Sequence, residues 1–402
     1  MVQDGPDRVG PQSLTGVQMG DQVRRVLPAV LGVAVVLTAC TANPAEQEAR
    51  PVPSSAPPAP PESTGPANSF SVLATGDVLI HPALTEQAEQ DAGQGSLDYR
   101  PLFAGLEPVV SGADLAICHL EVPLAEPDGA YSGYPSFNAP PQVADALADI
   151  GYDSCSTASN HTLDQGSEGV VRTLDTLDEA GIRHTGSART EQEAETPLVL
   201  DVNGVKVGQV SHTFGFNGYE LPEDKPWMSN PLDAEAVLAA AEATREAGAE
   251  VVIASLHWGT EYQHEPTAEQ QDLAAELLGS DAIDLILGHH AHVVQPIERI
   301  DGEWVAYGLG NSVAKHSEPR GVTEEGIAAR FHFARSADGW SVERAEYVPT
   351  LIDLGPPIRL TDLSGESGAD VPAARRVEAL ERIDDVVLSR DGGSTGLSRA
   401  GR

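Results

Sequence analysis

The sequence predicts an α/β fold with mixed sheets over residues 69–355 of the 402-residue chain. Short apolar runs typical of buried strands alternate there with segments that carry apolar residues at helical spacing. Polar residues with metal-binding side chains directly follow several of the apolar runs, and open α/β sheets bind ligands at the carboxyl ends of their strands. With 41% hydrophobic and 21% charged residues, the composition is that of an ordinary globular protein.

The strands are predicted from apolar runs that stop at a glycine or at a polar residue. In chain order they are residues 70–75, 115–120, 154–157, 198–202, 205–210, 251–256, 285–287 and 304–307. The dipeptide Asn203-Gly204, between the fourth and fifth runs, indicates a tight hairpin. We expect the run at 304–307 to be the final strand.

The helices are predicted from apolar residues that fall on one side of a helical turn. In chain order they are residues 140–150, 169–180, 232–247 and 267–278. Thr267 and Gln270 form a capping-box pattern at the start of the last one. Beyond residue 355 the pattern weakens, so we expect one charged helix at 371–389 and a disordered tail at 390–402.

The charge balance excludes one class of partner. The chain has 61 acidic and 24 basic residues, a formal charge of −37. Nucleic-acid binding requires a basic surface, which this chain lacks. An anionic substrate would need a strong local positive centre. The three cysteines are too few for a disulfide-built scaffold.

The N-terminus is typical of an export signal. Arg24-Arg25 precedes an uncharged stretch, 26–38, which is too short to predict a membrane span. Leu37-Thr38-Ala39-Cys40 resembles the bacterial lipobox, in which the cysteine is lipidated and becomes the new N-terminus. We therefore expect a lipoprotein signal peptide at 1–39. The alternative is an ordinary signal peptide with an incidental cysteine, and Met19 would also make a suitable start.

Residues 40–68 are rich in proline and poor in large apolar residues, which predicts a semi-extended tether. Such a tether would hold the following domain away from a membrane surface. Cleavage before Cys40 removes three acidic and three basic residues, so the mature charge stays at −37. We expect an exported protein that is lipid-anchored to the outer face of the cell membrane.

Candidate metal ligands stand at the ends of the predicted strands. They are Asp77, Glu121, Asn160, His257, His290 and His292. Because side chains at i and i+2 of an extended segment point to the same side, His290 and His292 make the better pair and His289 is the odd one. Carboxylates, an amide oxygen and imidazoles suit Mn, Fe or Zn, and a bridging carboxylate would allow two such ions.

A histidine that does not bind metal can protonate a leaving group. His161 is the candidate for that role, and Asp164, three residues on, would orient it.

Six motifs, taken together and in order, resemble the bacterial CapA family, which is linked to capsule and poly-γ-glutamate synthesis. They are Gly76-Asp77, His119-Leu120-Glu121, Ser159-Asn160-His161-x-x-Asp164-x-Gly166, His257-Trp258-Gly259-x-Glu261-Tyr262, Gly288-His289-His290-x-His292-Val293 and Gly308-Leu309-Gly310-Asn311. The likeness spans residues 70–355. It implies that the partners of this chain are a cell-envelope polymer and membrane proteins of capsule synthesis.

The CapA family is in turn similar to the calcineurin-type metallophosphoesterases. That similarity implies a four-layered α/β/β/α sandwich of the metallo-dependent phosphatase type with a two-metal site. Asp77 then matches a ligand of the first metal, Glu121 the bridging carboxylate and Asn160 a ligand of the second metal. His161 matches the histidine that serves as acid. His257, His290 and His292 match the remaining histidine ligands.

The chain departs from the phosphoesterase pattern at its first motif. Asp-x-His is replaced by Asp77-Val78-Leu79, so one metal loses a ligand unless His81 or His119 takes its place. The bridging position carries Glu121 where an aspartate is expected. One metal site would then be weak or absent, and phosphatase activity does not follow from the resemblance.

Two further sets of residues carry open predictions. Trp258, Glu261, Tyr262 and Asn311 are candidates for substrate binding, and packing is the alternative explanation. Cys118 and Cys155 either pair as a disulfide outside the cytoplasm or remain buried thiols.

Three hypotheses for function follow. The first is a lipid-anchored, metal-dependent hydrolase that acts on a phosphoester or an amide. The second is a non-catalytic component of capsule or poly-γ-glutamate assembly and export. The third is an adhesin or scaffold, against which the density of histidines argues. We expect a surface-anchored protein of capsule or poly-γ-glutamate synthesis or processing with a divalent-metal hydrolase-like site.

Overall fold

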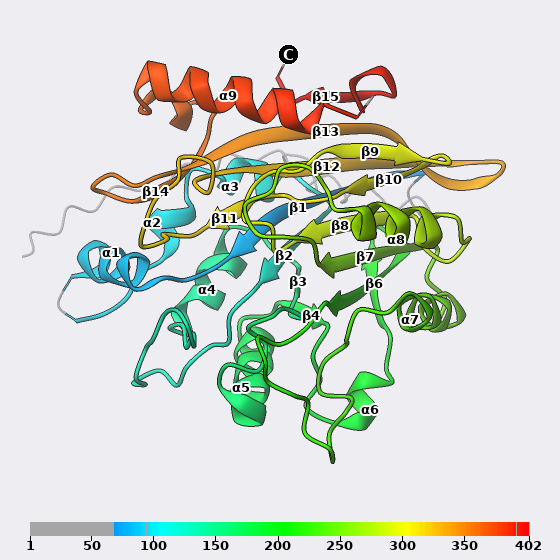
Figure 1. Cartoon of the computed structure of the whole chain (residues 1–402), viewed down its shortest axis with the longest axis horizontal. Coiled ribbons are helices and arrows are strands. Elements are labelled where there is room, and N and C mark those ends of the chain that lie inside the picture. The colour runs from blue at the N-terminus through cyan, green and yellow to red at the C-terminus, as the bar shows by residue number, and fades with distance from the viewer. Residues whose placement is uncertain (1–67, 94, 391, 402) are drawn as a thin grey trace, which may run out of the picture. The chain divides into compact units, whose positions relative to one another are not determined.

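The computed structural model describes residues 68–93, 95–390 and 392–401 (Figure 1). The predicted signal peptide, Cys40 and the tether up to residue 67 lie outside the described residues. Within the described chain, no helix combines the length and the apolar character needed to cross a membrane.

The larger of two sheets has the order β14-β13-β12-β1-β2-β3-β4, with β11 beside β1 and β15 beside β13. Its strands are β1 (Ser69–Val78), β2 (Leu115–Leu120), β3 (Ser154–Ser156), β4 (Arg183–Thr185), β11 (Asn311–Val313), β12 (Glu325–Ser336), β13 (Gly339–Asp353), β14 (Arg359–Asp362) and β15 (Leu397–Arg399). The pairs β1–β2, β2–β3, β3–β4 and β1–β11 are parallel, whereas β12, β13 and β14 join in antiparallel fashion.

The smaller sheet has the order β5-β6-β7-β8-β10-β9. Its strands are β5 (Leu198–Val202), β6 (Val205–Thr213), β7 (Val251–His257), β8 (Leu285–His289), β9 (Ile297–Ile300) and β10 (Glu303–Ala306). The expected hairpin joins β5 to β6, and Asn203 and Gly204 both have the positive φ that its tight turn requires.

The helices mostly cover the outer faces of both sheets, but the last of them packs on β12 and β13 from the side of the core between the sheets (Figure 1). They are α1 (Pro82–Ala92), α2 (Arg100–Phe103), α3 (Glu107–Val110), α4 (Gln142–Asp149), α5 (Gly166–Glu179), α6 (Glu191–Ala194), α7 (Ala234–Glu246), α8 (Ala268–Leu278) and α9 (Ala373–Val387), with short 3₁₀ turns η1 (Ser367–Ala369) and η2 (Gly392–Ser394). The predicted capping box of Thr267 and Gln270 begins α8.

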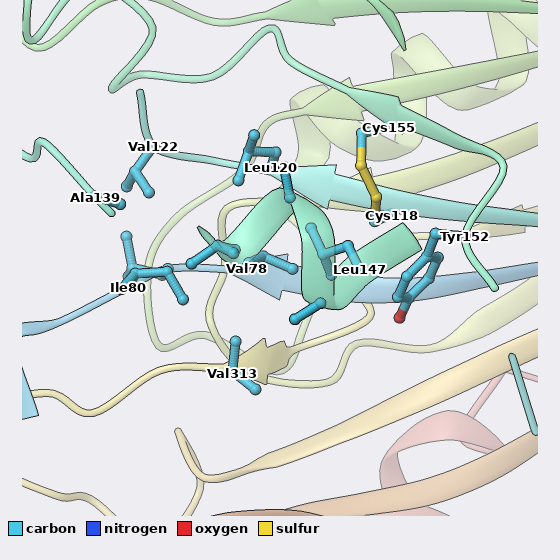
Figure 2. Packing of buried hydrophobic residues seen from close by; sticks show 14 of the residues in the cluster. Val78, Ile80, Cys118, Leu120, Val122, Ala139, Leu147, Tyr152, Cys155 and Val313 are labelled. Carbon is cyan, nitrogen blue, oxygen red and sulfur yellow. A yellow bond between two sulfur atoms is a disulfide. The ribbon is translucent and has the colours of Figure 1, made fainter. Parts of the chain in front are cut away.

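Three apolar cores give the order of the layers. One core joins α1, α2, α4 and α5 to the larger sheet, and Figure 2 shows part of it around Leu147 and Tyr152. A second core lies between the two sheets, and a third joins the smaller sheet to α7 and α8. The fold is therefore the expected α/β/β/α sandwich.

Two predictions about the C-terminal third are wrong. The run at 304–307 is not the final strand, because β12 and β13 form a long antiparallel hairpin that pairs with β1. The described part of the tail is not disordered throughout, because β15 pairs with β13 in parallel. The charged helix predicted at 371–389 is present as α9, which packs over β12 and β13. Alternating exposure along β12 weakens its apolar signal, and β15 is only three residues long.

The register of the strands places the polar residues at one edge. Asp77 pairs with His119 across β1 and β2, and also with Asn311 across β1 and β11. In the smaller sheet, His257 pairs with His289 across β7 and β8. Because these strands are parallel, their carboxyl ends lie on the same side, and ligands bind at such edges.

Candidate metal centre

Histidines and carboxylates from both sheets converge at these strand ends. Two groups of three can each supply ligand atoms within 4.8 Å of one another: Asp77, His119 and His289, and Glu121, His290 and His292. All six residues are buried. Sequence reasoning predicted four of them as ligands and named His119 as an alternative, but it set His289 apart.

In the first group, Asp77 Oδ1 lies 3.3 Å from His289 Nδ1. The rings of His119 and His289 stack with their centroids 4.1 Å apart. Asp77 comes from β1, His119 from β2 and His289 from the end of β8, so both sheets build this group. His119 thereby lies beside Asp77, whose own motif lacks the histidine of the Asp-x-His pattern.

In the second group, His292 Nε2 lies 3.7 Å from Glu121 Oε1. His292 Nδ1 also lies 3.1 Å from Asp77 Oδ2, which accepts a hydrogen bond from the backbone N–H of His290 at 3.2 Å. Asp77 therefore contacts residues of both groups.

The expected pairing of His290 with His292 is present, but the reason given for it is wrong. His290 and His292 have φ values of 90° and 55°, so the backbone is not extended there. The strand ends at His289, and the loop that follows turns both imidazoles toward Glu121.

The predicted ligands Asn160 and His257 join neither group but lie beside them. His257 Nδ1 is 2.9 Å from His119 Nε2, and His257 Nε2 is 3.0 Å from Asn160 Oδ1. His119 Nδ1 in turn contacts the hydroxyl of Ser156 at 2.8 Å. These contacts form a polar chain that fixes the orientation of His119.

Several buried polar atoms of the two groups have no hydrogen-bond partner among the described residues. They are Asp77 Oδ1, both carboxylate oxygens of Glu121, both ring nitrogens of His289 and Nδ1 of His290. An unsatisfied buried carboxylate is costly unless a cation compensates it. This donor set of carboxylates and imidazoles fits a borderline divalent metal.

The pKa values of the histidines also fit metal binding. Burial, followed by the charge of His292, lowers the pKa of His290 to about 3. Burial and the neighbouring His289 hold the pKa of His119 well below its usual range. Both imidazoles are therefore neutral near pH 7, which is the form that binds a metal.

The carboxylates and His292 show the opposite balance. Burial lowers the pKa of His292, but the charges of Glu121 and Asp77 outweigh it and raise that pKa to about 10. Burial also raises the pKa of Glu121 well above its usual range, against the opposing charge of His292. Burial raises the pKa of Asp77, but the contacts of His289 and His292 outweigh it and hold that pKa well below its usual range. In the bare site the His292 imidazolium thus compensates the Asp77 carboxylate, and a bound cation would replace its proton.

His161 and Asp164 contact each other as predicted from their spacing. His161 Nδ1 donates to Asp164 Oδ2 at 2.8 Å, and the same oxygen accepts from the backbone N–H of Phe137 at 2.7 Å. The carboxylate thereby fixes the tautomer of His161 and leaves Nε2 available. Asn217, which the sequence did not single out, bridges Asn160 and His161 with contacts of 3.3 and 3.4 Å.

The four candidate substrate-binding residues separate into two kinds. Trp258 is buried in the core under α7 and α8, where its Nε1 donates to the carbonyl of Tyr307 at 2.9 Å. Asn311 is also buried and contacts His292 Nδ1 through Oδ1 at 3.0 Å. Neither side chain is open to a substrate, so packing and positioning explain these two residues.

Tyr262 and Glu261 lie at the rim of the site. The ring of Tyr262 is 6.1 Å from that of His292, and Glu261 is exposed. On another side, the half-exposed ring of Phe214 lies 4.5 Å from the ring of His290. His81 and His316 add further imidazoles, 4.9 Å apart, with His316 5.3 Å from His292.

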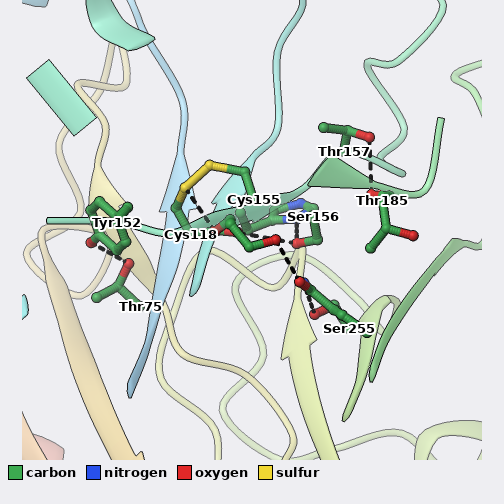
Figure 3. Close-up of a disulfide and its surroundings, with 11 residues drawn as sticks. Thr75, Cys118, Tyr152, Cys155, Ser156, Thr157, Thr185 and Ser255 are labelled. Atoms are coloured by element: carbon green, nitrogen blue, oxygen red, sulfur yellow. Dashed lines mark hydrogen bonds between the residues drawn. A yellow bond between two sulfur atoms is a disulfide. The ribbon is translucent and has the colours of Figure 1, made fainter. Parts of the chain in front are cut away.

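Cys118 and Cys155 form a disulfide across the neighbouring parallel strands β2 and β3 (Figure 3). Their Cα atoms are 4.5 Å apart, and both side chains are fully buried. The next residue on each strand is His119 and Ser156, which contact each other. The bridge therefore ties together the two strands that orient one histidine of the first group.

A close approach of two backbones completes the site. A Cβ atom on Gly76 would lie 2.0 Å from the carbonyl oxygen of Gly310. The absence of that atom lets β1 approach β11, which places Asp77 opposite Asn311. Both glycines lie in motifs that the sequence singled out.

Fold and site together define an α/β/β/α protein with a buried, histidine-rich candidate metal centre between the ends of two sheets. The chain belongs to the family described as bacterial capsule synthesis protein PGA_cap, which matches residues 71–316, more than half of its length. All six residues of the two groups lie within that match.

Relatives that are named for their function share this part of the chain. The PGA biosynthesis protein CapA of Bacillus subtilis is 24% identical over 274 residues, which cover 67% of this chain and 69% of that protein. The capsule biosynthesis protein CapA of Bacillus anthracis is 26% identical over 56% of this chain and 54% of its own length. A probable polyglutamine synthesis accessory protein of Mycobacterium tuberculosis is 28% identical over 50% of this chain. The chain spans about half the length of the latter two relatives.

Similar solved structures include two phosphoesterase-type proteins. A putative 5′-nucleotidase from Staphylococcus aureus has a TM-score of 0.44 at 15% identity, covering 79% of this chain and 59% of that one. The calcineurin-like phosphoesterase YfkN from Bacillus subtilis has a TM-score of 0.38 at 15% identity, covering 79% and 97%.

Proposed function

We propose that this protein acts in the synthesis or processing of a capsule-type, poly-γ-glutamate-like polymer through a divalent-metal, hydrolase-like site. Family membership supports the polymer. The observation that carries the site is the convergence of six buried ligand-type side chains, four of which have polar atoms without a hydrogen-bond partner among the described residues: Asp77, Glu121, His289 and His290.

The residues of the site would have separate roles in metal binding and in proton transfer. Asp77, His119 and His289 would hold one ion, and Glu121, His290 and His292 a second. A bound divalent ion supplies a Lewis acid and a water molecule of lowered pKa. His161 holds a proton on Nε2 when it is charged and can donate it to a leaving group at the rim, while Asp164 keeps the ring oriented.

A non-catalytic role in assembly or export of the polymer is the second candidate. It is favoured by the names of the relatives, which describe synthesis and accessory proteins rather than hydrolases. The departure from the Asp-x-His motif at Asp77 supports it too. In this case the centre would bind the polymer without cleaving it.

The proposed location is the outer face of the cell membrane, with lipidated Cys40 as the anchor. The lipobox-like sequence before Cys40 supports this, and so does the disulfide, because such bonds persist outside the cytoplasm. Cys40→Ser should move the protein from the membrane fraction to the soluble extracytoplasmic fraction. Unchanged fractionation would contradict the lipid anchor.

The test of the proposed function uses the full chain loaded with Mn, Fe or Zn. The probes are γ-linked glutamate oligomers, a phosphomonoester and a phosphodiester, each with wild type, His161→Ala and the control His332→Gln. His332 lies on β12 and pairs with Glu346, so its loss leaves the site intact.

We expect oligomer cleavage that falls by about 10²–10⁴ in His161→Ala, with metal content and melting temperature retained. Oligomer binding without turnover would favour the assembly role. Cleavage of a phosphoester alone would contradict the polymer as substrate. If no probe is bound and none is turned over, both proposals are contradicted.

A further inference from the structure

The loop between β11 and β12, residues 314–324, lies against the histidines of the centre. Asn311 Nδ2, at the start of β11, contacts His316 Nε2 at 3.4 Å. His316 in turn faces His292 and His81, with ring centroids 5.3 and 4.9 Å away. The family match ends inside this loop, at residue 316. The loop also carries cationic residues that the proposed mechanism does not use.

Arg320 and Lys315 are these cations. The guanidinium carbon of Arg320 lies 3.9 Å from the centroid of the Tyr262 ring, a cation–π contact at the rim. Lys315 donates its backbone N–H to His81 Nδ1 at 3.2 Å and directs Nζ to the carbonyl of His316 at 3.3 Å. The Lys315 ammonium therefore lies against the backbone of His316, and the Arg320 guanidinium lies over a ring that is 6.1 Å from the ring of His292.

Neither cation has a carboxylate within salt-bridge distance among the described residues. Elsewhere in this acidic chain, arginines such as Arg189, Arg330 and Arg382 are paired with carboxylates. In the described part of the chain, Arg183, Lys225, Arg299 and Arg376 also lack a salt bridge, so what distinguishes Arg320 and Lys315 is their place beside the centre of a chain with a net charge of −37. They provide the local positive potential that an anionic ligand needs in order to approach.

The ring beneath Arg320 is held in place by its backbone. Tyr262 has a φ of 64°, which is uncommon for a residue other than glycine, and its N–H donates to the carbonyl of Ala291 at 2.7 Å. This bond ties Tyr262 to the loop that carries His290 and His292. A strained backbone conformation of this kind persists where the surrounding contacts hold the residue in place.

We propose that Arg320 and Lys315, with Tyr262 as the platform, form a subsite for a carboxylate of a polyanionic chain whose backbone lies across the metal groups. This rests on the proposed function and names its substrate contact. A guanidinium matches a carboxylate in a bidentate arrangement. The Glu261 carboxylate, which contacts the Tyr262 side chain, opposes the binding.

The test is calorimetric titration of the metal-loaded full chain with a γ-linked glutamate oligomer, its α-carboxamide analogue and inorganic phosphate. The variants are Arg320→Gln, Lys315→Gln, Arg320→Lys and Glu261→Gln. Arg299→Gln is the matched control, because Arg299 makes a similar contact 5.8 Å from Trp304, on β9. Metal content is measured on every variant.

We expect each Gln variant of Arg320 and Lys315 to weaken oligomer binding about tenfold, and Arg320→Lys to weaken it less. Glu261→Gln should strengthen binding, and Arg299→Gln should leave it unchanged. The carboxamide analogue should bind weakly and without regard to these substitutions. Raised ionic strength should weaken the wild type toward the variants.

Equal oligomer affinity in wild type and in the Gln variants would overturn the subsite and leave the proposed function standing. Arg320-dependent binding of phosphate without binding of the oligomer would overturn the carboxylate assignment and the polyglutamate substrate together. Loss of metal in Arg320→Gln would show that the residue supports the centre and would also overturn the subsite.

Discussion

Asp77 shows how single residues shape the candidate centre. Its two oxygens approach His289 and His292 from different groups, and one of them accepts the N–H of His290. That position depends on the neighbouring Gly76, where β1 and β11 come into backbone contact. A residue with no side chain is therefore as important to the geometry as the ligands.

Gly76→Ala should disrupt the site. Its new Cβ would lie 2.0 Å from the Gly310 carbonyl oxygen, so one of the two strands must move. We expect a loss of at least about 2 kcal/mol in the free energy of unfolding, measured by urea denaturation, and reduced metal content.

Gly215→Ala is the matched control, because its Cβ would meet nothing within 4 Å. Equal stability and equal metal content in the two variants would contradict the importance of this close approach.

The sequence predicted the metal-binding residue types correctly, but it did not predict which way each side chain points. His257 and Trp258 are adjacent at the end of β7, and successive strand residues point to opposite faces. His257 therefore faces the centre while Trp258 enters the outer core. His289 was set apart on an assumption of extended backbone, which the positive φ of His290 invalidates.

At the scale of elements, the disulfide between β2 and β3 is the covalent support of the site. Cys118 and Cys155 are register partners, 37 residues apart in sequence. The sequence left their pairing open because it depends on a distance between Cα atoms. The parallel pairing of the two short strands brings them together.

Replacing both cysteines by alanine should lower the free energy of unfolding by about 2–4 kcal/mol, since the bridge closes a loop in the unfolded chain. Urea denaturation with and without reductant measures this change. Alkylation of the unreduced, unfolded wild type should leave Cys118 and Cys155 unmodified. Modification of both would show that the bridge is absent.

The C-terminal helix α9 is attached to the sandwich through a buried carboxylate. Glu325 at the start of β12 is fully buried and binds Arg375 at 2.5 Å and Arg382 at 2.9 Å. The family match ends before this helix, at residue 316. The carboxylate joins α9 to the strand that follows the loop of the proposed subsite.

Glu325→Gln should destabilise the protein by about 1–3 kcal/mol, because it removes the buried charge that the partly exposed guanidinium groups of Arg375 and Arg382 share. Hydrogen exchange should increase across α9. The control is Glu378→Gln, whose side chain is 59% exposed and also pairs with Arg382. A larger effect of the control would contradict the role of Glu325.

The elements themselves were predictable to the extent that their apolar runs were continuous. Fully buried β7 and β8 and the Asn203-Gly204 hairpin were evident in the sequence. The β12–β13 hairpin was missed although Asp338-Gly339 marks its turn, because polar residues alternate along both strands. The pairing of β15 is a tertiary contact that has no local signal.

At the scale of the whole molecule, the arrangement of the two sheets makes the centre. Each sheet contributes parallel strands whose carboxyl ends carry ligands, and the two edges meet there. The alternation of strands and helices predicted this class of fold, and the motif order predicted most of the ligands. The packing of the two sheets decides which histidine belongs to which group, and local sequence patterns do not predict that assignment.

The most direct test is elemental mass spectrometry of the full chain purified without chelators. It is compared with His119→Ala/His289→Ala, His290→Ala/His292→Ala and the control His332→Gln. We expect about two equivalents of Mn, Fe or Zn in wild type and control, and a loss of about one in each double variant. A folded wild-type protein that contains no metal, and binds none when each ion is added back, would contradict the metal centre.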